Sequence, residues 1–408
     1  LLKNDNGFLP LQPEAGQQKI KTSMFGNHSQ SLIYCGYGSS DTFKDTASVY
    51  DSFADSVFEL NPTLMNFYAN DGVGTTSGHD SIDPYRVGLP IRETPVSRYT
   101  EEVKNSYKDY NDLAIVFLSR TAGEGSDLPQ VSLNSGFTAR DDANKLDGAR
   151  YWDDHYLQLD RNETALLEYV GEKFDNVIVV LNTGSQFETG FLDDPGHYAY
   201  HENIRGALWM GFPGNGDGLE ALGEILVGAV NPSGHTVDTW ARDFKLDPTW
   251  SNMATYTNYL YKYSNYSSKS LVNYGEGIYV GYRYYETRGY EEGVPEGGVY
   301  TTKELHGTST TEWDSWYDAN VVYPFGHGLS YTDFTWTADF GSLKDATIDG
   351  KTKYTVTVTV HNDGDVAGKD VVQLYARTPY TDGGIEKSHV SLTGFAKTGI
   401  RQIVRSVY

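Results

Sequence analysis

The chain shows two hydrophobic patterns in succession. Up to about residue 245, apolar runs alternate with stretches of helical periodicity, and these runs lie at 20–25, 113–118, 177–181 and 207–212. Uninterrupted apolar runs mark strands covered on both faces, so we predict a largely parallel β-sheet with helices on both sides. From about Phe334 onward apolar and polar residues alternate strictly, which is the period of strands with one buried face.

Two helices of the first part can be argued from local signals. Residues 161–174 carry an apolar stripe, and Asp160 with Glu163 forms a capping box at its start. Residues 218–227 carry a second apolar face, which stops at Gly228. Residues 250–320 have no sustained helical period, so we expect long ordered loops and short strands there.

These patterns predict an α/β fold, a largely parallel sheet sandwiched by helices, followed by an all-β sandwich of the fibronectin type III kind. We place the α/β sandwich domain at 1–330, with a long loop insertion at 250–320, and the β-sandwich at 331–408. The chain starts abruptly at Leu1 and ends before such a sandwich would close. We therefore expect the natural protein to begin further upstream, and the sandwich to lack either terminal residues or an internal loop.

Composition narrows the classes of partner. The chain has 55 acidic and 32 basic residues and a formal charge of -23, which would repel a nucleic-acid backbone or an anionic membrane surface. No apolar run approaches the ~20 residues that span a bilayer. We predict neither partner. Aromatic residues make up 14% of the chain and suit neutral polyhydroxylated ligands, although packing in cores is the alternative interpretation for most tyrosines.

Cysteine and histidine usage gives little sign of a metal. The single cysteine, Cys35, excludes an intrachain disulfide and a cysteine cluster, but it does not separate a reducing compartment from export. We therefore expect a soluble protein, cytoplasmic or secreted. His197 and His201 have helical spacing without the acidic motif of a zinc helix, so we assign them a solvated or capping role. We predict no metal and no cofactor.

The candidate chemistry lies after the apolar run 113–118, where a glycine-flanked loop carries one carboxylate, Glu124. In parallel sheets, loops beyond the carboxyl ends of the strands form the ligand crevice. Gly123 and Gly125 would let a substrate approach the main chain closely. An ordinary surface turn is the alternative interpretation of this Gly-Glu-Gly sequence.

Several segments in the same order resemble the second half of glycoside hydrolase family 3, the β-glucosidase and β-xylosidase group. Together they cover nearly the whole chain. They are Leu1-Leu-Lys-Asn4 with Leu9-Pro-Leu11, Gly36-Tyr-Gly-Ser39, Arg120-Thr-Ala-Gly-Glu-Gly-Ser-Asp127, Val179-Val-Leu-Asn-Thr-Gly184, Asn231-Pro-Ser-Gly234, Tyr274-Gly-Glu-Gly-Ile-Tyr-Val-Gly-Tyr-Arg-Tyr-Tyr285 and Pro324-Phe-Gly-His-Gly-Leu-Ser-Tyr331. The chain differs from the family's usual residues at His235, Val237-Asp238 and His327, and none of these touches the proposed chemistry.

The resemblance implies roles for four residues. In the family, a (β/α)8 barrel supplies the aspartate nucleophile in an Asp-Trp context that this chain lacks, and the sandwich domain supplies the acid/base glutamate. The matching position is Glu124. Ser39 matches a residue that reaches the bound sugar, whereas Arg120 and Asp127 flank the glutamate, and we take them as residues that order its loop.

The resemblance implies that this chain is the acid/base half of a retaining glycosidase, and we take β-glucosidase over β-xylosidase. Such an enzyme hydrolyses terminal non-reducing β-D-glucosyl residues by double displacement, with two carboxyl groups about 5 to 5.5 Å apart. The expected partners are a β-glucoside or oligosaccharide and a barrel that precedes or follows this segment; whether the protein is a homo-oligomer stays open. The alternative is a noncatalytic carbohydrate-binding or structural module, and the presence of Glu124 in its full motif weighs against it.

Overall fold

The structure is a computed structural model of the protein. It describes residues 1–30, 32–36, 48–53, 56–72, 93–120, 155–214, 218–250, 274–291, 312–348, 351–399 and 405–407.

A six-stranded sheet forms the centre of the first part, with strand order β1-β6-β5-β4-β2-β3. Strands β2, β3, β4, β5 and β6 are parallel to one another, whereas β1 pairs antiparallel with β6 at one edge. Their bounds are β1 (Lys3–Asn4), β2 (Ile20–Phe25), β3 (Phe58–Leu60), β4 (Leu113–Arg120), β5 (Val177–Thr183) and β6 (Ile204–Trp209). The predicted parallel sheet is confirmed, although the run expected at 207–212 begins and ends earlier, as β6.

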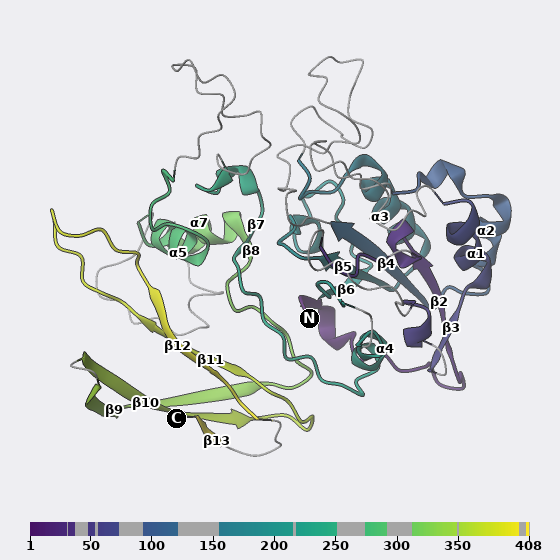
Figure 1. Cartoon of the computed structure of the whole chain (residues 1–408). Helices are drawn as coiled ribbons and strands as arrows, with labels where there is room; N and C mark the ends of the chain where they lie inside the picture. Colours follow the sequence, from purple (N-terminus) through teal and green to yellow (C-terminus); the bar gives the residue numbers. More distant parts are fainter. Residues whose placement is uncertain are drawn as a thin grey trace, which may run out of the picture.

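Helices cover both faces of this sheet (Figure 1). Side chains of a strand alternate between faces, so Ala114 and Val116 of β4 enter one hydrophobic core and Ile115 and Phe117 enter the other. The first core includes residues of three helices, and the second includes residues of one. These are α1 (Pro62–Asn70), α2 (Glu101–Ser106) and α3 (Arg161–Lys173) on the first face and α4 (Glu220–Leu226) on the second.

The local signals for two helices are confirmed. At the start of α3, Asp160 accepts a hydrogen bond from the Glu163 N–H at 2.7 Å, and Glu163 accepts from the Asp160 N–H at 2.9 Å. This is the predicted capping box. After α4 the chain reverses at Gly228, whose φ of 76° is the left-handed conformation that glycine adopts without strain.

The expectation of loops and short strands for 250–320 is wrong in two places, because α5 (Tyr282–Glu291) and α7 (Glu312–Asn320) are helices. The buried side chains of α5 include Tyr285, Glu286 and Thr287. Since two of these are polar, the helical period does not show in the hydrophobic pattern. The two helices pack together, and a short pair of strands, β7 (Trp240–Ala241) and β8 (Val321–Tyr323), lies beside them.

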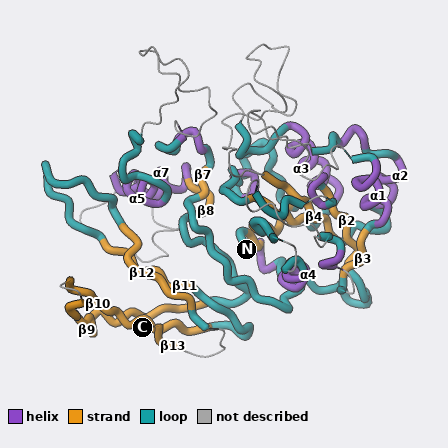
Figure 2. Tube along the Cα trace, viewed as in Figure 1, coloured by secondary structure: helices purple, strands orange, loops and turns teal. Residues whose placement is uncertain are grey.

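The carboxyl-terminal part is built of antiparallel strands, shown together at one end of the molecule in Figure 2. One sheet has the order β13-β10-β9, and the other pairs β11 with β12. The bounds are β9 (Phe334–Ile348), β10 (Lys351–Asn362), β11 (Val371–Ala376), β12 (Ser391–Lys397) and β13 (Arg405–Val407). The predicted order of an α/β fold followed by an all-β part is confirmed. The domain boundary near 330 and the fibronectin type III topology stay predictions.

Asn231 joins the two parts. Its side-chain oxygen accepts hydrogen bonds from the Ser330 hydroxyl and the Tyr331 N–H, both at 2.9 Å, and its amide nitrogen donates to the Ala367 carbonyl at 3.1 Å. One side chain thus links the turn after α4 to the entry of β9 and to the segment before β11. Within the described ranges, no helix has the length and apolar character needed to cross a membrane.

Candidate functional site

The candidate loop leaves the main sheet at the carboxyl end of β4. Arg120 is the last residue of this strand, and the described chain resumes at His155. Glu124 and Asp127 fall between these points, and Ser39 follows Gly36, so all three lie outside the described residues. The structure therefore describes the base of the site, namely the strand ends and the segments that enter and leave the two loops.

Arg120 holds the two ends of the candidate loop together. Its side chain is 1% exposed. Its Nε donates to the Tyr156 carbonyl, and its Nη2 donates to the Gln158 carbonyl at 2.7 Å. The guanidinium also lies 4.6 Å from the centre of the Phe187 ring. Because Tyr156 and Gln158 follow the loop in sequence, these bonds fix the returning segment beside the strand that the loop leaves.

Two buried carboxyl groups, Glu163 and Glu93, lie in this part of the fold, and Glu163 pairs with Arg120. Glu163 pairs with it through two bonds of 2.7 Å. Glu93 accepts from the backbone N–H groups of Asn27 at 3.0 Å and Thr94 at 2.8 Å. Burial raises the pKa of Glu93, and the nearby charge of Glu163 raises it further. All of these carboxyl groups have partners, which suits a scaffold rather than proton transfer to a substrate.

Asn182, in β5, organises the crevice where the strands end. Its oxygen accepts from the Ile33 N–H at 2.7 Å and from the Ser119 hydroxyl at 3.0 Å. Its nitrogen donates to the carbonyls of Ile33 at 2.9 Å and Gly211 at 2.7 Å. The side chain is fully buried and all four of its common hydrogen-bonding sites are used. Asn182 thereby anchors the segment that leads to Ser39.

One group of side chains near the loop could hold a metal by distance alone. Ligand atoms of His155, Glu188 and Asp243 lie within 4.8 Å of one another. Each already has a protein partner, however. His155 Nε2 lies 2.8 Å from Glu188 Oε1, which also accepts from the Phe244 N–H at 2.8 Å, and Asp243 caps the Lys245 N–H at 2.8 Å. These three side chains therefore fit a hydrogen-bonded link between the end of the candidate loop and residues 243–245 better than a metal centre.

The proposed helical pair His197 and His201 is wrong in its secondary structure, since both residues lie outside any helix, after the short 3-10 helix Gly190–Leu192. Proline at 195 and glycine at 196 favour turns at this point. The two rings bind local backbone N–H groups instead of capping a helix. His197 Nδ1 accepts from the Ala199 N–H at 3.1 Å, and His201 Nδ1 accepts from the Asn203 N–H at 3.2 Å.

Sequence reasoning missed Glu93, His155, Asn182 and Glu188. Apart from Thr94, which follows Glu93 directly, the partners named above are distant along the chain. For Asn182 a signal was present, because an asparagine that directly follows a continuous apolar strand lies at the carboxyl edge of a parallel sheet, where the crevice forms.

Comparison with known proteins identifies a family with this architecture. Residues 1–282 match the glycosyl hydrolase family 3 C-terminal domain. "Beta-glucosidase A" of Butyrivibrio fibrisolvens is 28% identical over 98% of this chain and 42% of its own length. A crystal structure of a beta-glucosidase from Paenibacillus barengoltzii superposes with a TM-score of 0.69 at 26% identity, over 100% of this chain and 36% of that one.

Beta-glucosidase 3B from Thermotoga neapolitana, solved in complex with glucose, superposes with a TM-score of 0.66 at 25% identity, over 100% of this chain and 46% of that one. The chain thus spans less than half the length of these relatives. On the match of residues 1–282, together with the parallel sheet and the antiparallel strands that follow it, the chain belongs to glycoside hydrolase family 3 and corresponds to its C-terminal part.

Proposed function

We propose that this chain is the acid/base-bearing part of a retaining β-glucosidase, with Glu124 as the general acid/base. The observation that carries the proposal is the position of Glu124, four residues beyond the end of β4, in a chain that matches family 3 glycosidases over nearly its whole length. Parallel sheets bind ligands at this edge. The substrates would be β-glucosides or short β-gluco-oligosaccharides.

The reaction needs a second carboxylate. In a double displacement, a nucleophile attacks the anomeric carbon while the acid protonates the leaving oxygen, and the same residue then activates water to release the sugar. A (β/α)8 barrel supplies the aspartate in this proposal. A carboxyl group that is buried against a barrel and close to a negative nucleophile stays protonated more easily, as its acid role requires.

Residues around Glu124 would position it. Arg120 ties the loop ends through Tyr156 and Gln158, which supports a loop-ordering role. We assign the same role to Asp127. Ser39 would hydrogen-bond the glycone, and the bonds from Asn182 to Ile33 support a fixed path for the segment before it.

The decisive experiment is Glu124→Ala in the full-length protein. A dinitrophenyl β-glucoside has a good leaving group, so its first step should survive and the glycosyl-enzyme should accumulate. Disaccharides, with poor leaving groups, should lose on the order of 10²- to 10⁴-fold in turnover. Azide needs no general base, so it should restore turnover and yield the β-glycosyl azide with retained configuration.

Asp127→Asn is the matched control, because it alters the same loop without removing the proposed acid/base. It should lower turnover of both substrates by similar factors, and azide should not restore it. If Glu124→Ala behaves in this way too, Glu124 is not the acid/base. If the unsubstituted full-length protein cleaves no β-glycoside at all, the noncatalytic module is the better description.

A further inference from the structure

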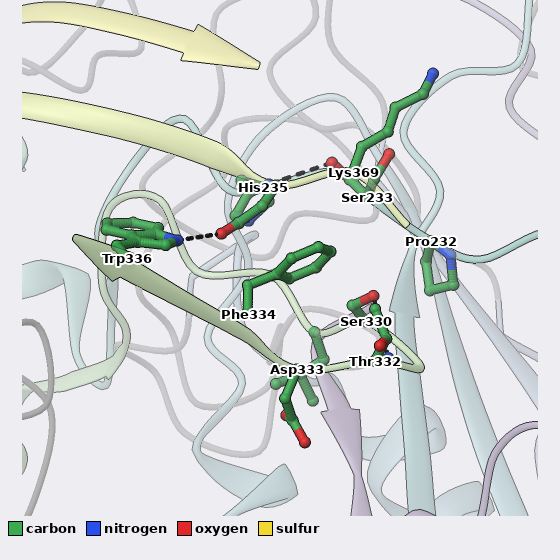
Figure 3. A pocket seen from close by; sticks show the side chains of 12 residues that line it. Pro232, Ser233, His235, Ser330, Thr332, Asp333, Phe334, Trp336 and Lys369 are labelled. Atoms are coloured by element: carbon green, nitrogen blue, oxygen red, sulfur yellow. Dashed lines mark hydrogen bonds and ion pairs between the residues drawn. The ribbon is translucent and has the colours of Figure 1, made fainter. Parts of the chain in front are cut away.

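A cavity of about 380 Å³ lies where the turn after α4 meets the entries of β9 and β11. Its walls come from Pro232–His235, from residues 328–336 and from Lys369–Asp370 (Figure 3). Small-molecule pockets in proteins typically measure about 300 to 1,000 Å³. None of the residues assigned above to the β4 loop or to its base lines this cavity.

Two aromatic rings form one wall. Phe334 and Trp336 are two positions apart on β9, so their side chains leave the strand on the same face, and both line the cavity. Trp336 is 39% exposed, although an indole of this size is usually well buried. The wall therefore offers an aromatic surface that a ligand can reach.

The indole of Trp336 is held in place. Its Nε1–H donates to Asp370 Oδ2 at 2.6 Å, and Asp370 Oδ1 accepts from the Val371 N–H at 2.8 Å. Asp370 itself is 9% exposed. A ring fixed in this way loses little freedom when a ligand stacks on it, and such preorganisation favours binding.

Polar groups flank the rings. In Figure 3 the carboxylate of Asp333 and the ammonium of Lys369 extend on opposite sides of the Phe334 ring. Among the described residues, neither side chain makes a hydrogen bond or an ion pair with another protein group. The hydroxyl of Ser233 also lines the cavity. The pocket thus combines a fixed aromatic face with an acceptor and a donor that are available to a ligand.

The charges at the cavity disfavour ionic ligands. The carboxylates of Asp333 and Asp370 are balanced by the ammonium groups of Lys369 and of Lys397, which donates to the Ser233 carbonyl at 2.5 Å, so no excess charge attracts an anion. Burial lowers the pKa of His235, so its ring adds no positive charge near neutral pH. A cation would meet Lys369, and both oxygens of Asp370 already accept hydrogen bonds from the protein.

A sugar ring fits these conditions, because it presents apolar C–H faces for stacking and hydroxyls that both donate and accept. We propose that this cavity is a saccharide-binding site, in which a pyranose stacks on Trp336 and Phe334 and its hydroxyls bond to Asp333 and Lys369. That it takes the same β-glucosides rests on the proposed function. The site would hold oligosaccharide chains on the protein.

The test is binding of thiocellobiose, whose sulfur bridge resists hydrolysis, to the full-length protein by titration calorimetry. Trp336→Ala should weaken this site by about fivefold or more, as expected for a central aromatic anchor. Phe340→Ala is the matched control: Phe340 lies on the same strand, is 64% exposed and does not line the cavity. It should leave the affinity unchanged.

Lys369→Gln and Asp333→Asn keep the proposal falsifiable if Trp336→Ala fails to fold, because they remove polar contacts and leave the aromatic wall intact. Each should weaken binding severalfold. The proposal is overturned if all three cavity variants bind thiocellobiose as the unsubstituted protein does, or if inorganic phosphate occupies the site in a Lys369-dependent way. Cleavage of a nitrophenyl β-glucoside by the unsubstituted protein tests the proposed function separately.

Discussion

Arg120 and Glu163 form a buried two-pronged ion pair, with Nη1–Oε1 and Nη2–Oε2 distances of 2.7 Å. The pair connects the last residue of β4 to the first turn of α3, across 43 positions of sequence that include the whole candidate loop. Both side chains are 1% exposed. The same glutamate completes the capping box with Asp160, so one carboxylate fixes both the start of the helix and the end of the strand.

Arg120→Met should destabilise the protein by about 3 to 5 kcal/mol, because it leaves the Glu163 carboxylate buried without its partner. Denaturant unfolding of the full-length protein measures this loss. The control is the double variant Arg120→Met with Glu163→Gln, which removes the paired carboxylate together with the guanidinium, while the amide oxygen can still accept at the capping box. The double variant should lose less free energy of unfolding than the two single variants lose in sum. If the two losses simply add, Arg120 and Glu163 do not stabilise the protein as a pair.

Gly26→Ala tests how closely β2 and β4 approach. Gly26 has a φ of 92°, and a Cβ there would lie 2.4 Å from the Phe117 carbonyl oxygen, which belongs to the backbone of β4 and cannot swing away. Gly16 has a φ of 91° and no heavy atom within 4 Å of the same position, so Gly16→Ala isolates the cost of the dihedral angle.

Gly16→Ala should cost about 1 to 3 kcal/mol, the usual cost of an unfavourable backbone conformation. Gly26→Ala should exceed about 4 kcal/mol, because the clash adds to that strain. Thermal unfolding and soluble yield compare the two variants. Equal stability would mean that the strand end moves freely, which the proposed role of this edge as a rigid base does not allow.

The sequence predicted what local signals determine. The capping residues Asp160 and Glu163, three positions apart, mark the start of α3. Continuous apolar runs mark β4 and β5. Helix α5 was missed because Tyr285, Glu286 and Thr287 are buried through aromatic and polar contacts, which a hydrophobic period does not detect. The same holds for the candidate site. A sequence motif suggests Glu124, whereas the contacts of Arg120 with Gln158 and of Asn182 with Ile33 depend on the fold.

Ser39→Ala tests the proposed contact with the glycone. Removing one hydrogen bond of about 0.5 to 1.5 kcal/mol should lower kcat/KM for a β-glucoside by a factor of about 2 to 13. Ser40→Ala, one residue further along, is the matched control: it removes a hydroxyl to which the proposal assigns no contact with the glycone, so kcat/KM should stay unchanged. If both variants match the unsubstituted protein, Ser39 makes no contact with the glycone.

The last prediction concerns Glu286, which is buried on α5 where this helix meets α7 and the carboxyl-terminal strands. Burial raises the pKa of its carboxyl from 4.5 to about 7, although the hydrogen bond from Tyr317 works in the opposite direction. The ionisable groups near it are the Tyr317 hydroxyl at 2.8 Å on α7 and Tyr375 on β11. Helix α5 also touches the strand region directly, through Tyr282, which accepts from the Leu392 N–H at 2.9 Å.

Because the folded state holds this proton more tightly than the unfolded chain, its contribution to stability is fully present below pH 4.5 and is lost as the pH rises to about 7. Glu286→Gln has no proton to lose, and its amide oxygen can still accept from Tyr317. The variant should therefore match the parent at pH 4.5 and become more stable than the parent above pH 7, by on the order of 3 kcal/mol.

Thermal midpoints of the full-length protein and the Glu286→Gln variant, measured from pH 4.5 to 8, give this difference directly. Glu168→Gln is the matched control, since Glu168 lies exposed within α3 and its loss should shift the midpoint only by a small amount. A midpoint difference for Glu286→Gln that stays constant over this range would mean that the carboxyl is ionised in the folded protein. In that case the carboxyl would have the same pKa in the folded protein as in the unfolded chain, and the packing of α5 against the strands would not depend on its protonation.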